Sequence, residues 1–314
     1  MKLIPTKLKF NDEGTTPQFA LETAPEHIKL HALVLAIAKS RGGKTFFITH
    51  LLNWLKFDLV CVITPTFESN SGHFKKMNVL PENVFDPDDP EVVGKIITIV
   101  EKERDDLVDY RRKVQMVKEL KELYRTPKRM GEHYELFSEY VDPFGGWIKP
   151  THKYNGRKPR IALYVDDSQS SLIFRNRRFL NLCTRARHLG SMPDTEEASI
   201  GLSIFIACQN YTAQGGGLPK AVRGNATHLA LWRTKNEKEL KLISEELAGV
   251  VSPELFRKAY DYCMADESDK YAMMFVDMHP KDGFPVFRKN YTELLVLDET
   301  APKSEEKSEE TQST

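Results

Sequence analysis

The chain has 314 residues, of which 40% are hydrophobic and 10% aromatic, and its 45 basic and 45 acidic side chains balance to a net charge of zero. This composition allows a sizeable hydrophobic core and is typical of neither an intrinsically disordered protein nor a membrane protein. The longest apolar runs are far shorter than the roughly 20 residues that cross a bilayer, and the first residues have no signal-peptide pattern, so we expect an intracellular protein without a membrane segment.

Short apolar runs alternate with longer amphipathic stretches, which is typical of a mainly parallel sheet flanked by crossover helices. We expect strands at 33–38, 59–64, 161–165, 202–208 and 226–232. We expect helices at 44–55, 174–188, 237–248 and 253–264. Two further runs, at 272–277 and 285–289, flank a turn at Asp282 and Gly283 and predict a C-terminal β-hairpin.

Two charged segments stand apart from this α/β pattern. The segment at about 91–130 has a narrow apolar stripe and is interpreted as one or two exposed helices inserted into the core fold. A solvated helical hairpin is the favoured interpretation, and an arm that contacts DNA or a partner is the alternative. The segment 297–314 is rich in Glu, Lys, Ser and Thr and predicts a disordered acidic tail. We therefore predict a single domain over 1–296.

Charge and cysteine content narrow the classes of function. Without the tail from Asp298 onwards, the chain has 43 basic and 39 acidic residues, a net charge of +4 that is compatible with nucleic-acid binding. The cysteines are far apart in the sequence and form no CxxC pair, so neither a structural zinc site nor a disulfide framework is expected. They are Cys61, Cys183, Cys208 and Cys263.

The strongest local motif lies between the first core strand and the first core helix. It fits the phosphate-binding pattern GxxxxGK[ST], known as Walker A, except that alanine replaces the first glycine. Its residues are Ala38, Lys39, Ser40, Arg41, Gly42, Gly43, Lys44 and Thr45. A glycine-rich loop lets successive backbone N–H groups surround phosphates. Lys44 is then expected to contact the β- and γ-phosphates of ATP, and the Thr45 hydroxyl to bind Mg²⁺.

Alanine at position 38 is tolerable if its φ is negative, and costs about 1 kcal/mol or more if φ must be positive.

Two later strands end in polar residues that complete such a site. The apolar run at 161–165 is followed by Asp166 and Asp167, as in a Walker B motif. We expect Asp166 to hold Mg²⁺ and Asp167 to act as general base on the attacking water. Gln209 follows the run at 202–208 and is a candidate to sense the γ-phosphate or that water, with a capping role as the alternative.

The order of these motifs resembles the FtsK/HerA superfamily. A helix end at 184–190, Thr-Arg-Ala-Arg-His-Leu-Gly, precedes the Gln209 strand, and Leu-Pro-Lys-Ala-Val-Arg-Gly-Asn follows it at 218–225. The resemblance spans roughly residues 33–232 and is greatest to the poxvirus-type genome-packaging ATPases of large DNA viruses and virophages. It implies a RecA-like core and a pentameric or hexameric ring that hydrolyses ATP with Mg²⁺ between subunits and translocates double-stranded DNA.

The resemblance also implies partners and an arginine that acts in trans. Such an arginine contacts the γ-phosphate held by the neighbouring subunit, and a planar, permanently charged guanidinium suits that contact. Arg187 is the best match, Arg185 the second and Arg223 the third. The implied partners are double-stranded DNA and a capsid vertex or portal protein, and the implied location is the host cytoplasm or a viral factory, or the virion.

A packaging motor holds DNA without reading its sequence, so lysine and arginine contacts to phosphates should dominate. Basic side chains cluster in the helix after Asp167 and in the loop before the Walker B strand. The candidates are Arg175, Arg177, Arg178, Lys153, Arg157 and Lys158. Subunit contacts are an equally favoured role for the three arginines of the helix. Two other functions stay open, a cellular or plasmid HerA-like motor and a nucleotide-binding assembly switch with little turnover.

Overall fold

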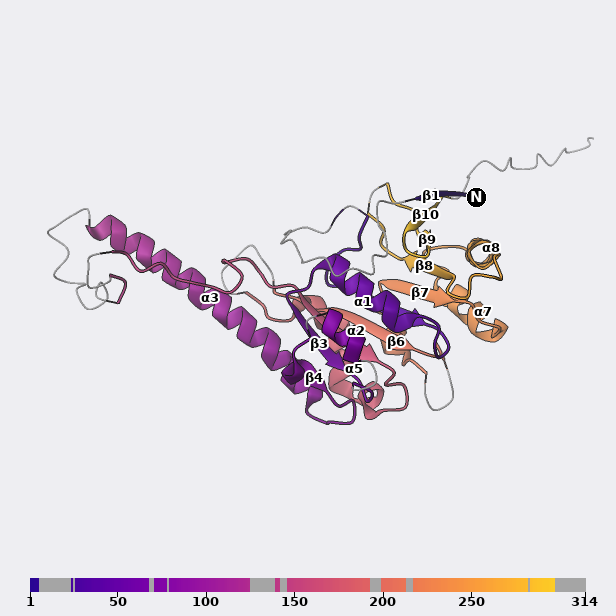
Figure 1. Ribbon diagram of the computed structural model, residues 1–314, viewed down its shortest axis with the longest axis horizontal. Coiled ribbons are helices and arrows are strands. Elements are labelled where there is room, and N and C mark those ends of the chain that lie inside the picture. The colour runs from indigo at the N-terminus through magenta and orange to yellow at the C-terminus, as the bar shows by residue number, and fades with distance from the viewer. Residues whose placement is uncertain are drawn as a thin grey trace, which may run out of the picture.

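The molecule is built on a ten-stranded sheet with the order β1-β10-β9-β8-β7-β2-β6-β5-β3-β4 (Figure 1). The structure, a computed structural model, describes residues 1–5, 24, 26–67, 71–77, 79–124, 139–141, 146–192, 199–212, 217–281 and 283–296. The tail at 297–314, the expected helical residues 125–130 and Asp282 of the expected turn lie outside these ranges. Among the described residues, no helix is both long and apolar enough to cross a membrane.

Six neighbouring strands run parallel and form the centre of the sheet. They are β7 (His228–Trp232), β2 (Leu33–Ile37), β6 (Ser203–Cys208), β5 (Ile161–Asp166), β3 (Leu59–Ile63) and β4 (Val84–Phe85). All residues of β2, β5, β6 and β7 are buried, as expected for parallel strands with both faces covered. The strand before Gln209 lies between the phosphate-loop strand and the Walker B strand, so the RecA-like core predicted from the sequence is confirmed.

Alternate residues of β2 pack on opposite faces of the sheet. Val34 and Ala36 belong to a core formed with helix α1 (Lys44–Leu55). Leu33 and Leu35 belong to the other core. That second face is covered by the start of α3 (Val92–Tyr124) and by α5 (Arg177–Arg185), α6 (Lys220–Arg223), α7 (Glu237–Glu246) and α8 (Pro253–Cys263). The short helix α2 (Ser71–Lys76) lies beside α1. All four cysteines are buried and free.

Four antiparallel strands extend the sheet beyond β7. They are β8 (Met273–Asp277), β9 (Phe287–Lys289), β10 (Glu293–Val296) and β1 (Lys2–Pro5). The pairing of β8 with β9 confirms the predicted C-terminal hairpin. Strands β10 and β1 were not predicted, and their pairing brings the beginning of the chain against residues 293–296.

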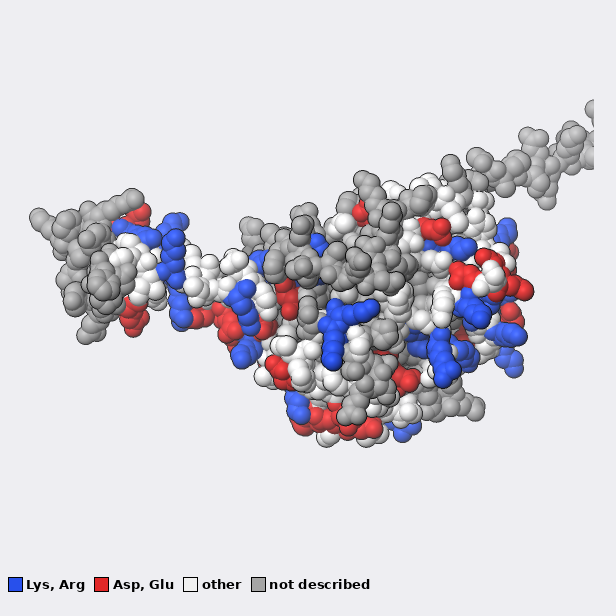
Figure 2. Space-filling view, in the orientation of Figure 1, with Lys and Arg blue, Asp and Glu red and all other residues white. Residues whose placement is uncertain are grey.

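The charged insertion begins as one continuous helix, α3 (Val92–Tyr124), about 50 Å long at 1.5 Å per residue. Val92, Val93, Ile96, Val100 and Leu107 are buried in the second core. Beyond this part the helix leaves the globular body (Figure 1), and basic and acidic side chains alternate along it (Figure 2). The described part is therefore a long projecting helix.

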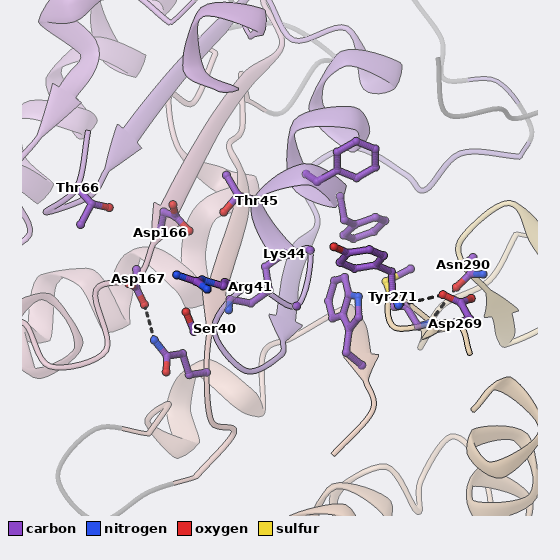
Figure 3. Close-up of a pocket in the computed structure, with 17 residues that line it drawn as sticks. Ser40, Arg41, Lys44, Thr45, Thr66, Asp166, Asp167, Asp269, Tyr271 and Asn290 are labelled. Carbon is purple, nitrogen blue, oxygen red and sulfur yellow. Dashed lines mark hydrogen bonds between the residues drawn. The ribbon is translucent and has the colours of Figure 1, made fainter. Parts of the chain in front are cut away.

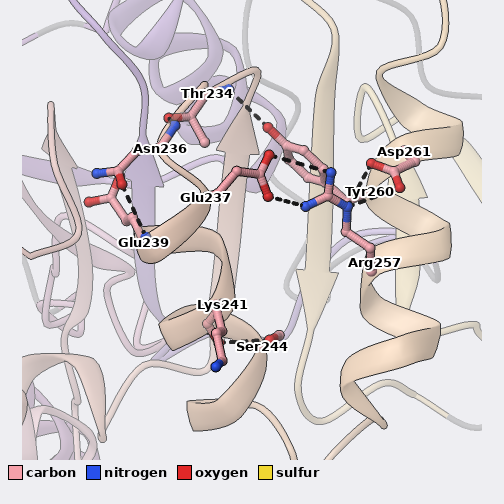
Figure 4. Close-up of polar contacts among 9 residues, drawn as sticks. All are labelled: Thr234, Asn236, Glu237, Glu239, Lys241, Ser244, Arg257, Tyr260 and Asp261. Atoms are coloured by element: carbon pink, nitrogen blue, oxygen red, sulfur yellow. Dashed lines mark hydrogen bonds and ion pairs between the residues drawn. The ribbon is translucent and has the colours of Figure 1, made fainter.

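Helices α7 and α8 hold the end of β7 in place (Figure 4). Arg257 of α8 forms ion pairs with Glu237 of α7 and with Asp261, but all three side chains are exposed, so these pairs contribute about 1 kcal/mol at most. Tyr260 contributes more to the stability of the fold than these ion pairs do. Its hydroxyl donates to the backbone carbonyl of Trp232 and accepts from the backbone N–H of Thr234. An unsatisfied buried backbone group costs about 1–3 kcal/mol.

Candidate functional site

The carboxyl-terminal ends of β2, β5, β6 and β7 meet at a cavity of about 860 Å³ (Figure 3). Open parallel sheets bind ligands at this end of their strands. Residues from three parts of the chain line the cavity. They are Ser40 to Phe47, then Thr66, Asp166, Asp167 and Gln209, and finally Trp232, Asp269, Tyr271, Met273 and Asn290. The structure thus brings together most of the predicted phosphate loop, the two aspartates and the glutamine.

The phosphate loop needs its glycines because it closes tightly. Gly43 is the N-cap of α1 with φ +94°, a conformation that favours glycine. The N–H of Gly42 donates to Lys39 O at 3.1 Å, and a Cβ on Gly42 would lie 2.7 Å from the Ala38 Cβ. The φ of Ala38 is not positive, so alanine in place of the first glycine causes no backbone strain. Arg41 is the residue of this loop that carries a strained, positive φ of 60° without being glycine.

Lys44 is held inside this loop. Its ammonium donates to the carbonyls of Ala38 at 2.8 Å and Lys39 at 3.2 Å, and the residue is 8% exposed. Burial lowers the pKa of Lys44, whereas the nearby Asp166 carboxylate acts in the opposite direction. The backbone N–H groups at the start of α1 face the same cavity, so the loop combines an ammonium group with the positive end of a helix.

Asp166 is nearly inaccessible, with 2% of its surface exposed. Burial raises its pKa to about 6, although the Tyr164 hydroxyl, which donates to Asp166 Oδ1 at 2.7 Å, lowers it. Tyr164 also contacts the Thr45 side chain, and so brings the two predicted metal ligands to one place. Among the described residues, no three His, Cys, Asp or Glu side chains form a metal site. One carboxylate and one hydroxyl fit Mg²⁺, which keeps water and phosphate oxygens as its other ligands.

Asp167 and Gln209 contact each other directly. Gln209 Nε2 donates to Asp167 Oδ1 at 3.0 Å (Figure 3), and Asp167 has a positive φ of 47°. Gln169 positions the glutamine, because its Oε1 accepts from the backbone N–H of Gln209 at 2.7 Å and its Nε2 donates to Asn210 O at 2.8 Å. Lys39 Nζ in turn donates to Asn210 Oδ1. These bonds connect the ends of β2, β5 and β6. Gln169 and Asn210 were not predicted.

An aromatic wall, formed by Phe46, Phe47, Trp232 and Tyr271, lines the cavity. Within it, Tyr271 lies on the side away from Asp166 and Asp167 (Figure 3). Tyr271 is 64% exposed, and its ring carbon Cδ1 lies 3.3 Å from the position of a Cβ on Gly43. An exposed aromatic ring beside a phosphate loop can stack with a nucleobase, an interaction of about 1–3 kcal/mol. Trp232 and Tyr271 were not predicted, because they lie in segments without a recognisable motif.

The loop that carries Tyr271 is fixed by hydrogen bonds. Asp269 Oδ1 accepts from the backbone N–H of Tyr271 at 2.9 Å, and Arg233 donates to the backbone carbonyls of Met264 and Asp266. The position of the exposed ring is therefore determined by the end of α8 and the end of β7.

The three arginines predicted to act in trans lie outside the described lining of this cavity. Arg185 ends α5, and Arg187 lies in the following short 3-10 helix (Ala186–His188); both are exposed. Arg223 differs because it forms an ion pair with Glu246 at 2.8 Å and donates to Leu218 O. This intrachain pairing disfavours a role for Arg223 in a neighbouring subunit.

The candidate DNA contacts fall into two groups. Arg175, Arg177 and Arg178 are exposed near the start of α5. Lys153 pairs with Glu103, and Arg157 pairs with Asp58. The third residue of that loop, Lys158, donates to Ser199 O at 2.8 Å. The loop before β5 is therefore held to the body of the protein by its basic residues.

Comparison with known proteins finds similar solved structures but no similar sequence. No protein-family model and no curated protein matches the sequence. Similar solved structures include the genome packaging NTPase B204 from Sulfolobus turreted icosahedral virus 2 in complex with AMPPCP, at 12% identity and a TM-score of 0.42 over 82% of this chain and 96% of that one.

The DNA-packaging ATPase B204 from Sulfolobus Turreted Icosahedral Virus has 12% identity and a TM-score of 0.41, over 83% of this chain and 98% of that one. The pCW3 conjugation coupling protein TcpA, in its monomer form with ATPgS, has 12% identity and a TM-score of 0.38, over 79% and 58%. Because these TM-scores are low, we infer function from the residues of the cavity.

Proposed function

We propose that the protein is an ATP-driven motor that moves double-stranded DNA into a viral capsid, with ATP hydrolysed at subunit interfaces of a ring. The observation that supports it most is the convergence of the phosphate loop, two aspartates and Gln209 on one cavity at the ends of adjacent strands. The cavity volume of about 860 Å³ lies within the range of small-ligand sites and accommodates a nucleotide.

The phosphates of ATP would lie on the loop at 38–45. Backbone N–H groups at the start of α1 and the Lys44 ammonium provide the positive charge that binds them. The base would stack on the exposed ring of Tyr271 at the other side of the cavity. In this placement the nucleotide extends across the cavity, with its phosphates near the two aspartates and its base against the aromatic wall.

Thr45 and Asp166 would hold Mg²⁺, which neutralises charge on the transferred phosphoryl group when it is bound. Asp166 is suited to this because its pKa of about 6 leaves it largely ionised at neutral pH. Asp167 is then the general base that orients and deprotonates the attacking water. Gln209 donates a hydrogen bond to Asp167 and so lies beside the expected γ-phosphate. A shift of Gln209 on hydrolysis would be transmitted to Gln169 and Asn210 through their hydrogen bonds.

The DNA-moving part of the proposal derives from the sequence resemblance and from the exposed arginines. Arg185 and Arg187 lie at the surface, where a residue that serves a neighbour's site must lie. Arg175, Arg177 and Arg178 are exposed on the same helix or just before it and remain candidates for contact with DNA phosphates or with a neighbouring subunit.

A triplex-displacement assay tests the motor directly. Purified protein is mixed with linear duplex DNA that carries a fluorescent third strand, at low salt with Mg²⁺ and ATP. We expect the third strand to be released with ATP, and not with a non-hydrolysable analogue or with the Lys44→Ala variant. ATP hydrolysis without any strand release, on DNA of every length tested, would contradict the motor.

A further inference from the structure

Two polar side chains, Asp269 and Asn290, line the same cavity as the phosphate loop but have no part in the proposed hydrolysis. In Figure 3 both lie on the side of Tyr271 that is remote from Asp166 and Asp167. A nucleotide with its phosphates on the loop and its base on Tyr271 would extend in that direction. The edge of the base would therefore meet these two side chains.

Asp269 is held in a fixed orientation by its own stretch of chain. It lies in the loop between α8 and β8, and its Oδ1 accepts from the backbone N–H of Tyr271 at 2.9 Å. Such a turn uses one carboxylate oxygen and fixes the plane of the group. Oδ2 forms no hydrogen bond to the described part of the chain. Because a carboxylate only accepts hydrogen bonds, Asp269 offers the cavity one acceptor.

Asn290 is anchored in the same way but offers the opposite polarity. Its Oδ1 accepts from the backbone N–H of Met273 at 2.9 Å, and its own backbone N–H donates to Met273 O at 2.8 Å. Since a backbone N–H is a donor, the side-chain atom that faces it must be the oxygen, which fixes the orientation of the amide. Nδ2 bonds to none of the described residues, so Asn290 offers the cavity one donor.

The turn that carries Asn290 has an unusual backbone. Asn290 and Tyr291 connect β9 to β10 with positive φ angles of 51° and 64°. Asparagine adopts this conformation more readily than an aromatic residue does. Tyr291 retains it because its ring is fully buried and stacks on Trp54, with the ring centroids 5.5 Å apart. Such strain is concentrated at ligand sites, and here it holds Asn290 against β8.

The two side chains belong to one short stretch of the cavity wall. Each accepts from a backbone nitrogen, of Tyr271 in one case and of Met273 in the other. These nitrogens are two residues apart, which is at most about 7 Å along an extended chain. The labelled side chains accordingly lie near each other at the end of the cavity in Figure 3. A single base beside Tyr271 can therefore contact both.

We propose that Asp269 and Asn290 recognise the edge of the base and select adenine, an inference that rests on the proposed nucleotide site. The Watson–Crick edge of adenine has one donor, the 6-amino group, and one acceptor, N1. Asp269 accepts from the amino group, and Asn290 donates to N1. Guanine, cytosine and uracil each present three polar groups on that edge. One of the three would be left without a partner, which weakens binding.

The experiment compares ADP with inosine diphosphate, because hypoxanthine has the shape of adenine with both polarities reversed, a 6-oxo acceptor and an N1–H donor. Binding to the full chain is measured by calorimetry with Mg²⁺. The double variant Asp269→Asn with Asn290→Asp exchanges donor and acceptor, retains both anchoring oxygens and leaves the net charge unchanged. Asp266→Asn is the control, because Asp266 Oδ1 accepts from Ser268 N at 2.9 Å in a matching turn of the same loop, outside the described lining of the cavity.

The wild type and Asp266→Asn should bind ADP about tenfold or more tightly than inosine diphosphate. The double variant should bind inosine diphosphate as tightly as ADP or more tightly. Both nucleotides carry the same phosphates, so effects on the phosphate loop cancel in the ratio of their affinities.

Three results would overturn the proposal and leave the nucleotide site standing. They are equal affinity of the wild type for the two nucleotides, a preference of the wild type for inosine diphosphate, and an unchanged ratio in a folded double variant. Thermal unfolding checks that the variants are folded. If the wild type binds neither nucleotide, the nucleotide site itself is wrong, and this proposal falls with it.

Discussion

Replacing Gly42 by alanine tests whether the phosphate loop is shaped as described. The new Cβ would lie 2.7 Å from the Ala38 Cβ and 3.0 Å from Lys39 O. Carbon atoms in contact are normally about 3.5–4.0 Å apart, so the loop would have to open by close to 1 Å. Because φ at Gly42 is not positive, the backbone tolerates alanine and these two contacts decide whether the substitution destabilises the loop. Such overpacking costs about 1–3 kcal/mol.

That cost converts to a loss of about 5- to 150-fold in ATP affinity, if the bound nucleotide requires the closed loop. The double variant Ala38→Gly with Gly42→Ala removes the Cβ contact and leaves the contact with Lys39 O, so it should recover part of the affinity. Ala38→Gly alone should change affinity little, because the backbone at this position already has a negative φ.

The assay is equilibrium binding of a fluorescent ATP analogue to the four proteins of this cycle, with thermal unfolding as a check that each is folded. Two results would refute the reasoning. One is wild-type affinity in Gly42→Ala, and the other is a double variant that binds no better than Gly42→Ala.

Further predictions concern the same cavity and the arginines predicted to act in trans. Lys44→Ala should abolish ATP turnover, and a wild-type rate in a hydrolysis assay would remove the phosphate-loop assignment. Burial raises the pKa of Asp166 from 3.8 to about 6, so the folded protein should lose stability as pH rises from about 4 to 6. Only the ionised carboxylate binds Mg²⁺, so Mg²⁺-dependent nucleotide affinity should fall as pH drops below about 6. Tyr164→Phe removes the hydrogen bond that lowers this pKa, and a titration of affinity should shift to higher pH; an unchanged profile would contradict the assignment. Arg187→Ala should preserve ATP binding and unfolding temperature but stop hydrolysis and poison mixed assemblies. Arg223→Ala should lower the unfolding temperature because it removes the ion pair with Glu246 and leaves that carboxylate with the Tyr211 hydroxyl.

The central strands could be predicted because each is a mainly apolar run. The expected strand at 33–38 is β2 (Leu33–Ile37), and that at 226–232 is β7 (His228–Trp232). A strand that is buried on both faces is mainly apolar, so it is visible in the sequence. Strands β10 and β1 could not be found in this way. They lie at one edge of the sheet, and their pairing joins residues 2–5 to 293–296, a contact that no local pattern specifies.

Helix limits were predicted less well where irregular turns interrupt them. The helix expected at 174–188 is divided into a 3-10 turn at Leu172–Arg175, α5 and a second 3-10 turn at Ala186–His188. Asn176 causes the first break, because its side chain accepts from the backbone N–H of Arg178 and begins α5 there. The charged segment at 91–130 was compatible with one or two helices, and its described part, Val92–Tyr124, is one helix.

In the candidate site, too, the residues that belong to a sequence motif could be predicted, and those brought there only by the fold could not. The phosphate loop and the two aspartates were found because phosphate and metal chemistry restricts several consecutive residues. Gln169 was missed because a single glutamine two residues after Asp167 has no pattern, although it fixes the backbone at Gln209. Tyr271 was missed because its relation to Gly43 depends on the antiparallel pairing of β8 with β7.

The rate of ATP hydrolysis by the purified protein, with and without linear double-stranded DNA at low salt with Mg²⁺, tests the central claim most directly. We predict a measurable rate that linear duplex DNA increases several-fold and that is lost in Lys44→Ala. ATP binding with no hydrolysis in either condition would contradict the claim and would leave a nucleotide-binding protein that does not use Asp167 as a base.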